Sequence, residues 1–171
     1  MATEMIVRLK QVSVTKALIA ASAYSAEDVV SESATNTVGT SWTFSAITRG
    51  NNLGGYIVKA QVISETTNIT PRLTLYLFNV VPTSELDDNA ANTALLHADL
   101  AKYVGKIDFP AMEDLGGDSS ALATPSTYGN LPLAFKCTTN ADDLFGILVT
   151  RDAFTQTAGD DMTVILTCEQ N

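Results

Sequence analysis

The chain has 171 residues, a formal net charge of −9 and a hydrophobic fraction of 46%. A chain of this size buries about 70% of its unfolded surface, which predicts one self-supporting domain over residues 1–171. Only 17% of the residues are charged, which argues against disorder. The acidic balance argues against nucleic acid as a partner, because binding a polyanion needs clustered Lys and Arg. The sequence contains no run of about twenty apolar residues, so it predicts no membrane-spanning helix.

The first expected element is a strand over residues 4–15. Two interpretations of it are open. It is an edge strand that Arg8 and Lys10 protect from unwanted pairing, or residues 1–15 form an arm that contacts a neighbouring protein. The apolar run at residues 17–23 is similar to the centre of a secretory signal peptide. Because the run is short and follows a strand-like segment, we interpret it as part of the mature protein.

A short irregular strand is expected over residues 24–31, and residues 40–47 alternate cleanly after it. The alternation places Trp42, Phe44 and Ala46 on one face. Carbohydrate-binding modules usually present several aromatic side chains on an exposed face. Because Trp42 is aligned with apolar neighbours, we predict that it belongs to the core.

Residues 56–81 carry the densest β-branched and aromatic content of the chain and predict a β-hairpin with a turn at residues 66–71. Alternate positions of its first strand share one face: Tyr56, Val58, Ala60 and Val62. The second strand has an unbroken apolar face of three leucines: Leu73, Leu75 and Leu77. Apolar residues at every second position, with polar residues on a solvent-exposed opposite face, are typical of a half-buried antiparallel sheet. We therefore expect the core to lie under the leucines.

Residues 90–103 are the one segment with helical spacing, at Leu96, Leu100 and Tyr103. They predict a short helix in a crossover between strands. His97 is the only histidine of the chain. No serine or cysteine motif accompanies it, so we interpret it as a surface or capping residue rather than a general base.

The C-terminal half predicts a short strand at residues 103–110, followed by a long loop at residues 111–128. Ordered loops of this length are usually functional or lie against a partner. Three further strands are expected in the remainder: residues 129–138, 144–151 and 162–169.

Two groups of residues bear on cross-links and metals. Cys137 and Cys168 lie in strand-like runs, and we interpret them as buried free thiols, with a single disulfide as the alternative. Three Asp doublets fall in turns: residues 87–88, 142–143 and 160–161. Asp is common in turns because its side chain bonds the local backbone, so we expect structural roles. A Ca²⁺ site where the doublets converge is the alternative.

The sequence contains no nucleophile elbow, P-loop or metal-ligand spacing, so neither an enzyme nor a cofactor is expected. With roughly eight or nine predicted strands, one helical crossover and no repeats, the economical architecture is all-β. We expect an antiparallel two-sheet β-sandwich, jelly-roll-like, with one short helix in a crossover.

From residue 55 onward, five segments carry a likeness: 56–60, 69–78, 86–94, 103–110 and 123–133. Over these segments the chain resembles virion structural proteins of tailed bacteriophages, of the capsid decoration or cement type. The likeness extends over the whole stretch and includes no active-site motif.

This resemblance implies a non-enzymatic protein that binds the outside of a phage capsid and stabilises the shell. It implies the major capsid protein as partner, together with further copies of this chain, and no membrane or nucleic acid. The location would be the outer capsid surface, after assembly in the cytoplasm of the bacterial host. We expect contacts from residues 1–15 and from the loop at 111–128. The candidate contact residues are Val7, Arg8, Lys10, Leu115, Asp118 and Pro125.

Two other functions are open. The first is a different virion part, such as the base of a head fibre, a neck protein or a tail protein. The second is a secreted carbohydrate-binding or adhesion module, which only the apolar run at residues 17–23 favours.

Overall fold

The computed structural model describes residues 8–18, 23–32, 39–114, 116–126 and 130–170. Its regular structure is antiparallel β throughout, which confirms the all-β prediction. The elements in chain order are β1 (Arg8–Ala17), β2 (Ala23–Tyr24), β3 (Val29–Val30), β4 (Trp42–Phe44), β5 (Gly54–Ser64), β6 (Leu73–Phe78), the 3₁₀ turn η1 (His97–Asp99), β7 (Tyr103–Asp108), β8 (Glu113–Asp114), β9 (Ser119–Ala123), β10 (Leu133–Lys136), β11 (Leu144–Thr150), β12 (Phe154–Thr155) and β13 (Asp161–Gln170). No helix among the described residues is long and apolar enough to cross a membrane.

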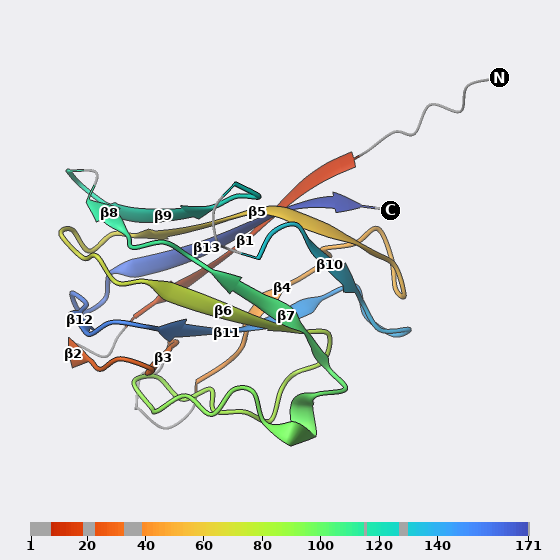
Figure 1. The fold of residues 1–171 in the computed structure, drawn as a ribbon, viewed down its shortest axis with the longest axis horizontal. Coiled ribbons are helices and arrows are strands. Elements are labelled where there is room, and N and C mark those ends of the chain that lie inside the picture. Colours follow the sequence, from red (N-terminus) through yellow and green to blue (C-terminus); the bar gives the residue numbers. More distant parts are fainter. Residues whose placement is uncertain (1–7, 19–22, 33–38, 115, 127–129, 171) are drawn as a thin grey trace.

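The larger sheet has the strand order β1-β13-β5-β9-β8, and β10 also pairs with β5 (Figure 1). β1 lies at one edge of this sheet and pairs with β13 along its whole length. From Arg8 onward, the described part of the first predicted element is therefore an edge strand, and an arm formed by residues 1–15 stays a prediction. β8 forms the opposite edge.

The smaller sheet has the order β3-β11-β6-β7, with β4 also paired to β11, and β2 pairs with β12 separately. The main core lies between the two sheets: Val62 and Leu166 of the larger sheet belong to the same buried cluster as Leu75 and Leu148 of the smaller one. Both sheets therefore contribute one apolar face to a common core.

The other face of the smaller sheet is covered by the chain between β6 and β7. Phe78, Ile147 and Val149 form a second buried cluster there, against which Leu86 and Leu95 of that connection pack. Figure 1 shows this connection, in green, running below the smaller sheet. The smaller sheet is thus buried on both faces.

The predicted hairpin at residues 56–81 is wrong, because β5 and β6 belong to different sheets. β5 pairs with β13, β9 and β10, whereas β6 pairs with β11 and β7. The connection at residues 65–72 crosses from one sheet to the other. Thr66 fixes this crossing by donating a hydrogen bond to Asp160 at 2.8 Å. Each strand's alternation specifies a buried face and does not specify a pairing partner.

The three predicted core leucines, Leu73, Leu75 and Leu77, are fully buried, which confirms the face assigned to β6. The face assigned to β5 is wrong at its start. Lys59 pairs with Thr167 and Ile57 with the next residue of β13, so Val58 is an extra residue in a β-bulge. A bulge reverses the alternation, so Ile57 is buried while Tyr56 is 44% exposed.

The predicted helix at residues 90–103 is also wrong, since this segment contains only the 3₁₀ turn η1. Asn92 closes a local turn, in which its Oδ1 accepts from the Ala94 amide at 2.8 Å. Such side-chain bonds to nearby backbone compete with helix formation. Leu96 and Leu100 are exposed, so they provide no buried helical face.

The long loop predicted at residues 111–128 is interrupted by two strands, β8 and β9. β9 pairs with residues 60–64 of β5, which extends the larger sheet.

The predicted core position of Trp42 and Phe44 is confirmed, and the Trp42 indole donates to the Val30 carbonyl at 2.9 Å. Ala46 departs from their face, because it is exposed with a φ of 52°.

Candidate interaction surface

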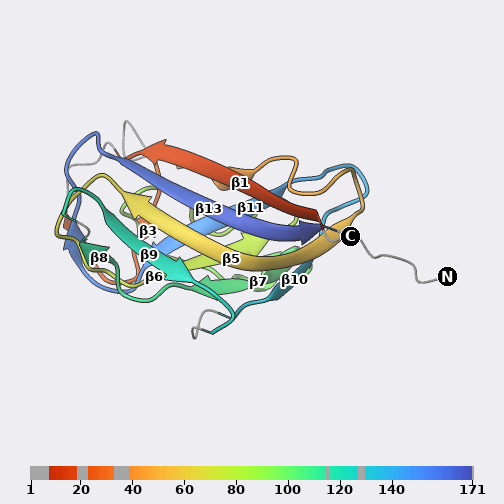
Figure 2. The same cartoon turned by 90° about the horizontal axis from the view of Figure 1, so that it is seen from above.

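The outer face of the larger sheet is open. Figure 2 shows β1, β13, β5 and β9 side by side, with no described element lying over them. On these four strands, most of the side chains that point to this face are uncharged: Leu9, Gln11, Ser13 and Thr15 from β1, Thr163, Ile165, Thr167 and Glu169 from β13, Tyr56, Lys59, Gln61 and Ile63 from β5, and Ser120 and Leu122 from β9. We call this set the outer face. Among these side chains, only Lys59 and Glu169 are charged, and the flanking strands add Glu113 of β8 and Lys136 of β10 on the same side of the sheet.

Strand pairing arranges the outer face in rows. Ser13, Ile165, Gln61 and Leu122 are successive partners across four strands. Polar members of the rows bond one another: the Thr15 and Thr163 hydroxyls lie 2.7 Å apart, and Gln61 Nε2 donates to the Ser120 hydroxyl at 3.1 Å. A protein partner could cover such a face without desolvating a dense set of charges. Depletion of charge is the compositional mark of interface cores.

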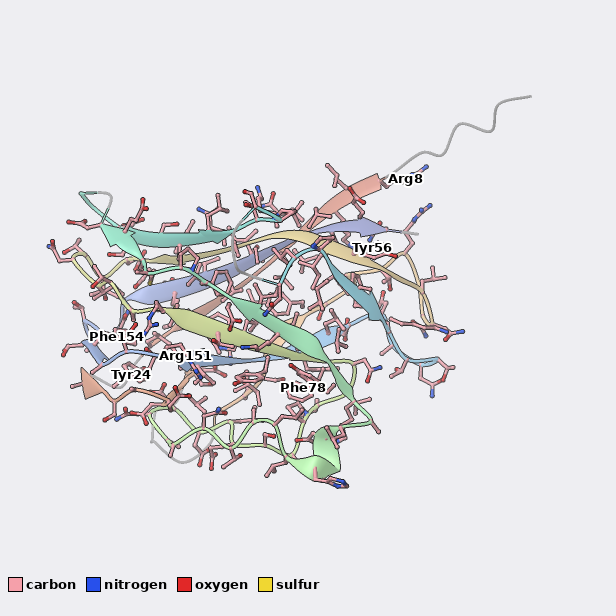
Figure 3. The ribbon with its side chains drawn as sticks, in the orientation of Figure 1. Arg8, Tyr24, Tyr56, Phe78, Arg151 and Phe154 are labelled. Carbon is pink, nitrogen blue, oxygen red and sulfur yellow. The ribbon has the colours of Figure 1, made fainter. Side chains whose placement is uncertain are left out.

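The starting end of β1 is basic and exposed. Leu9 is 67% exposed, the largest exposed fraction among the large hydrophobic residues that are exposed. Arg8 is exposed beside it and forms no ion pair with a described residue (Figure 3). Lys10 is half-buried and donates to the Ala46 carbonyl. Val7, the remaining predicted contact residue of this segment, lies outside the described residues.

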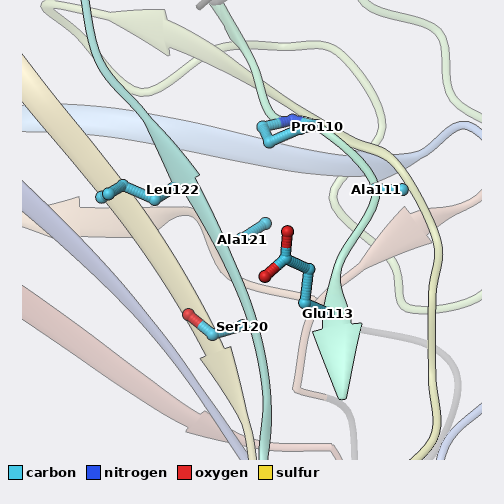
Figure 4. A pocket seen from close by; sticks show the side chains of 6 residues that line it. All are labelled: Pro110, Ala111, Glu113, Ser120, Ala121 and Leu122. Carbon is cyan, nitrogen blue, oxygen red and sulfur yellow. The ribbon is translucent and has the colours of Figure 1, made fainter. Parts of the chain in front are cut away.

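The opposite edge of the sheet is acidic and hollowed. A pocket of about 330 Å³ lies where the chain enters β8 beside β9 (Figure 4). Its lining residues are Pro110, Ala111, Glu113, Ser120, Ala121 and Leu122. The Glu113 side chain points towards β9 in Figure 4, and its pairing with Ser120 places both side chains on the same face of the sheet. Asp114 is also exposed, and its Oδ1 accepts from the Gly116 amide at 2.9 Å.

The predicted contact residues do not form one site. Arg8 and Lys10 lie on the β1 edge, whereas Asp118 and Pro125 flank β9 near the opposite edge, both exposed. Leu115 lies outside the described residues. Sequence reasoning missed the outer face as a whole. The signal was present in the scarcity of charges at alternate positions of β1 and β13, but Ser and Thr at these positions are equally typical of a solvated face.

The Asp doublets have separate structural roles. Asp87 accepts from the Gly39 amide at 3.0 Å, Asp143 from the Ala46 amide at 2.9 Å, and Asp160 from the Thr66 hydroxyl. Asp88 is buried and accepts from Tyr24 and from the Ser31 amide, both at 2.9 Å. Desolvation raises the pKa of Asp88 despite these bonds. Within the described ranges, no three His, Cys, Asp or Glu side chains gather as metal ligands do. These bonds give the carboxylates structural roles, but they reach residues far apart in the sequence rather than the local turn backbone that was expected.

Cys137 and Cys168 are both buried and free, as predicted. Burial raises the pKa of both thiols, and that of Cys168 reaches about 12. His97 is exposed on η1. None of these three residues lies on the outer face.

Comparison with known proteins assigns no family. No protein-family model matches the chain, and no curated protein matches it.

Proposed function

We propose that this protein is a non-enzymatic structural component of a tailed-phage virion that binds the outside of the capsid and stabilises the shell. In this proposal its two sheets form a jelly-roll-like sandwich, and its partner is the major capsid protein. The observation that carries the proposal is the outer face, which is open and includes only Lys59 and Glu169 as charged side chains on a molecule whose net charge is −9.

Two physical arguments support this role. The acidic charge outside this face keeps the free protein soluble and discourages misplaced contacts between copies. A shell repeats one small interface many times, so even a modest affinity per site would brace the whole particle. The smaller sheet is less suited to docking, because the connection between β6 and β7 already covers its outer face.

The first experiment measures the copy number of this protein in purified, DNA-filled phage particles by quantitative mass spectrometry, with the major capsid protein as internal reference. A copy number close to that of the capsid protein is the expected result. A handful of copies would instead assign the protein to the neck, the tail or a fibre base. Absence from the particle would overturn the proposal and favour a secreted module.

A second experiment tests the docking face with purified shells that lack this protein. Ser13→Glu combined with Gln61→Glu places two charges in the middle of the outer face. We expect shell binding to fall roughly tenfold or more, because each added carboxylate must be desolvated on docking. Thr155→Glu is the matched control, since Thr155 is exposed in β12, outside the larger sheet. Equal binding by the two variants would show that another surface contacts the shell.

A further inference from the structure

The two edges of the larger sheet carry complementary features. At the β1 edge, the exposed side chain of Leu9 follows Arg8, whose guanidinium has no ion-pair partner among the described residues. At the β8 edge, the carboxylates of Glu113 and Asp114 likewise form no ion pair with the described part of the chain. Within the described part of the chain, one edge therefore carries a cation without an ion pair next to an apolar side chain, and the other carries two carboxylates without ion pairs beside a pocket.

The shape of the pocket suits this pair of side chains. Apolar atoms of Pro110, Ala111 and Leu122 provide a lining for an aliphatic group, and its volume of about 330 Å³ exceeds that of one leucine side chain (Figure 4). Leu122 is 43% exposed and belongs to the outer face, as does Leu9. Burying both would remove two of the exposed large hydrophobic side chains from water.

The alternation of the strands adds a geometric match. Successive residues of a strand point to opposite faces, so Arg8 and Leu9 face opposite ways, as do Glu113 and Asp114. When two sheet edges meet with their outer faces continuous, Leu9 reaches the pocket. Arg8 then projects to the same side of the joined sheets as Asp114, and its long side chain remains close to the carboxylates of Glu113 and Asp114.

One copy cannot make this contact with itself. In Figure 1, β8 lies at the left end of the long axis and the start of β1 lies at the right, and Figure 2 agrees. A symmetric pairing of two β1 edges would leave Glu113 and Asp114 of both copies without a cation opposite them. Contact between unlike edges is heterologous, and it repeats from copy to copy as a ring or a row.

We propose that the Arg8–Leu9 end of one copy docks at the β8–β9 edge of a second copy, with Leu9 in the pocket and Arg8 beside Glu113 and Asp114. This association needs no shell, so its test uses the purified protein alone. A failure of copies to associate would therefore not contradict the proposed capsid binding. A failure to bind the capsid would likewise not contradict association between copies.

Disulfide trapping tests the geometry. Leu9→Cys and Leu122→Cys variants, distinguished by a mass tag on one of them, are mixed and oxidised. The native thiols Cys137 and Cys168 are buried and do not compete. We expect dimers that join Cys at position 9 of one variant to Cys at position 122 of the other. A predominance of dimers within either single variant, or no disulfide-linked dimer at all, would overturn the proposal.

Charge reversal in the same trapping assay tests the electrostatic match. Added to the Leu9→Cys variant, Arg8→Glu should lower the yield of mixed dimer roughly tenfold, because it places like charges together. Glu113→Lys with Asp114→Lys in the Leu122→Cys variant should do the same, and combining both sets should restore the yield. His97→Glu is the control, since His97 is exposed on η1, outside the larger sheet. Equal yields throughout would contradict the assigned contact, provided that circular dichroism shows all variants folded.

Discussion

Lys16 in β1 forms an ion pair with Glu32, which lies two residues after the end of β3. The pair therefore connects the edge strand of the larger sheet to the smaller sheet. The lysine side chain is only 6% exposed. Its ammonium group also donates to Thr40 and lies 5.2 Å from the centre of the Trp42 ring. Desolvation lowers the pKa of Lys16, although the bond with Glu32 opposes this effect.

Glu32→Gln should therefore lower the free energy of unfolding by about 2–3 kcal/mol at pH 7, because it leaves a buried charge without its counter-ion. Lys16→Met should change it by no more than about 1 kcal/mol, since it removes the charge and keeps an apolar chain of similar length. Urea unfolding measures both changes. Equal losses in the two variants would show that the ion pair itself, and not the desolvated ammonium, decides stability here.

The same cation predicts a pH dependence in the Glu32→Gln variant. With a lowered pKa, Lys16 binds fewer protons in the folded than in the unfolded state, so stability rises with pH through the range between its folded pKa and 10.5. We expect this variant to gain stability between pH 7 and 10 relative to the wild type. The double variant with Lys16→Met should lose that gain.

Asp99 holds the loop before η1 and has no exposed surface. Burial would raise the pKa of Asp99, but bonds from the amides and hydroxyls of Thr83 and Ser84, and from Lys102, together hold it far below the ordinary carboxyl value. Asp99→Asn should lower the free energy of unfolding by about 3 kcal/mol at pH 7, because the NH2 group of the new side chain would face some of these donors. Denaturant unfolding measures the loss, and Asp118→Asn in an exposed turn should change stability by less than about 0.5 kcal/mol.

The sign of the pH effect at Asp99 is opposite to that at Lys16. A depressed carboxyl pKa contributes stability above the unfolded value of 3.8, and this contribution is lost as the pH falls towards the folded pKa. Between pH 5 and 2, the wild type should therefore lose more stability than Asp99→Asn. Parallel curves for the two proteins would contradict the assigned role of this carboxylate.

Leu75 lies at the centre of the main core and is fully buried. Leu75→Ala should cost about 2–5 kcal/mol through lost burial and the cavity left behind. Leu75→Asp should yield no soluble folded protein, because a buried carboxylate would lack any partner. Leu100→Asp is the control at a leucine that is 51% exposed, and it should melt close to the wild type. A cooperatively folded Leu75→Asp variant would contradict the assigned face of β6.

The two thiols should be inert in the folded protein. Both are buried, and burial raises the pKa of Cys168 to about 12, so almost no thiolate is present at pH 8. A thiol-specific chromogenic reagent should label neither Cys137 nor Cys168 in native protein and both in denaturant. Fast labelling of native protein would reveal local opening around β13 or β10.

The sequence alone determined the strand character of the chain and most of its buried faces. A period of two specifies which side chains of a strand share a face, and this local property correctly placed the three leucines of β6, as well as Trp42 and Phe44. The edge position of β1 was one of two interpretations that Arg8 and Lys10 left open, the other being an arm that contacts a neighbouring protein.

Only the tertiary structure decided which strands pair. Hydrogen bonds between residues far apart in sequence place β5 beside β13 and β9, and the bulge at Val58 moves Tyr56 to the outer face. β9 carries small side chains with weak strand preference, and its pairing with β5 makes it a strand.

The candidate surfaces depend on these pairings. The outer face exists because alternate positions of β1, β13, β5 and β9 are brought into common rows. The docking edges exist because pairing places Arg8 and Glu113 on opposite sides of one sheet. The order of residues within one strand decides which of its side chains share a face. The neighbours of that strand in the sheet depend on long-range pairing, which the sequence of a single strand does not encode.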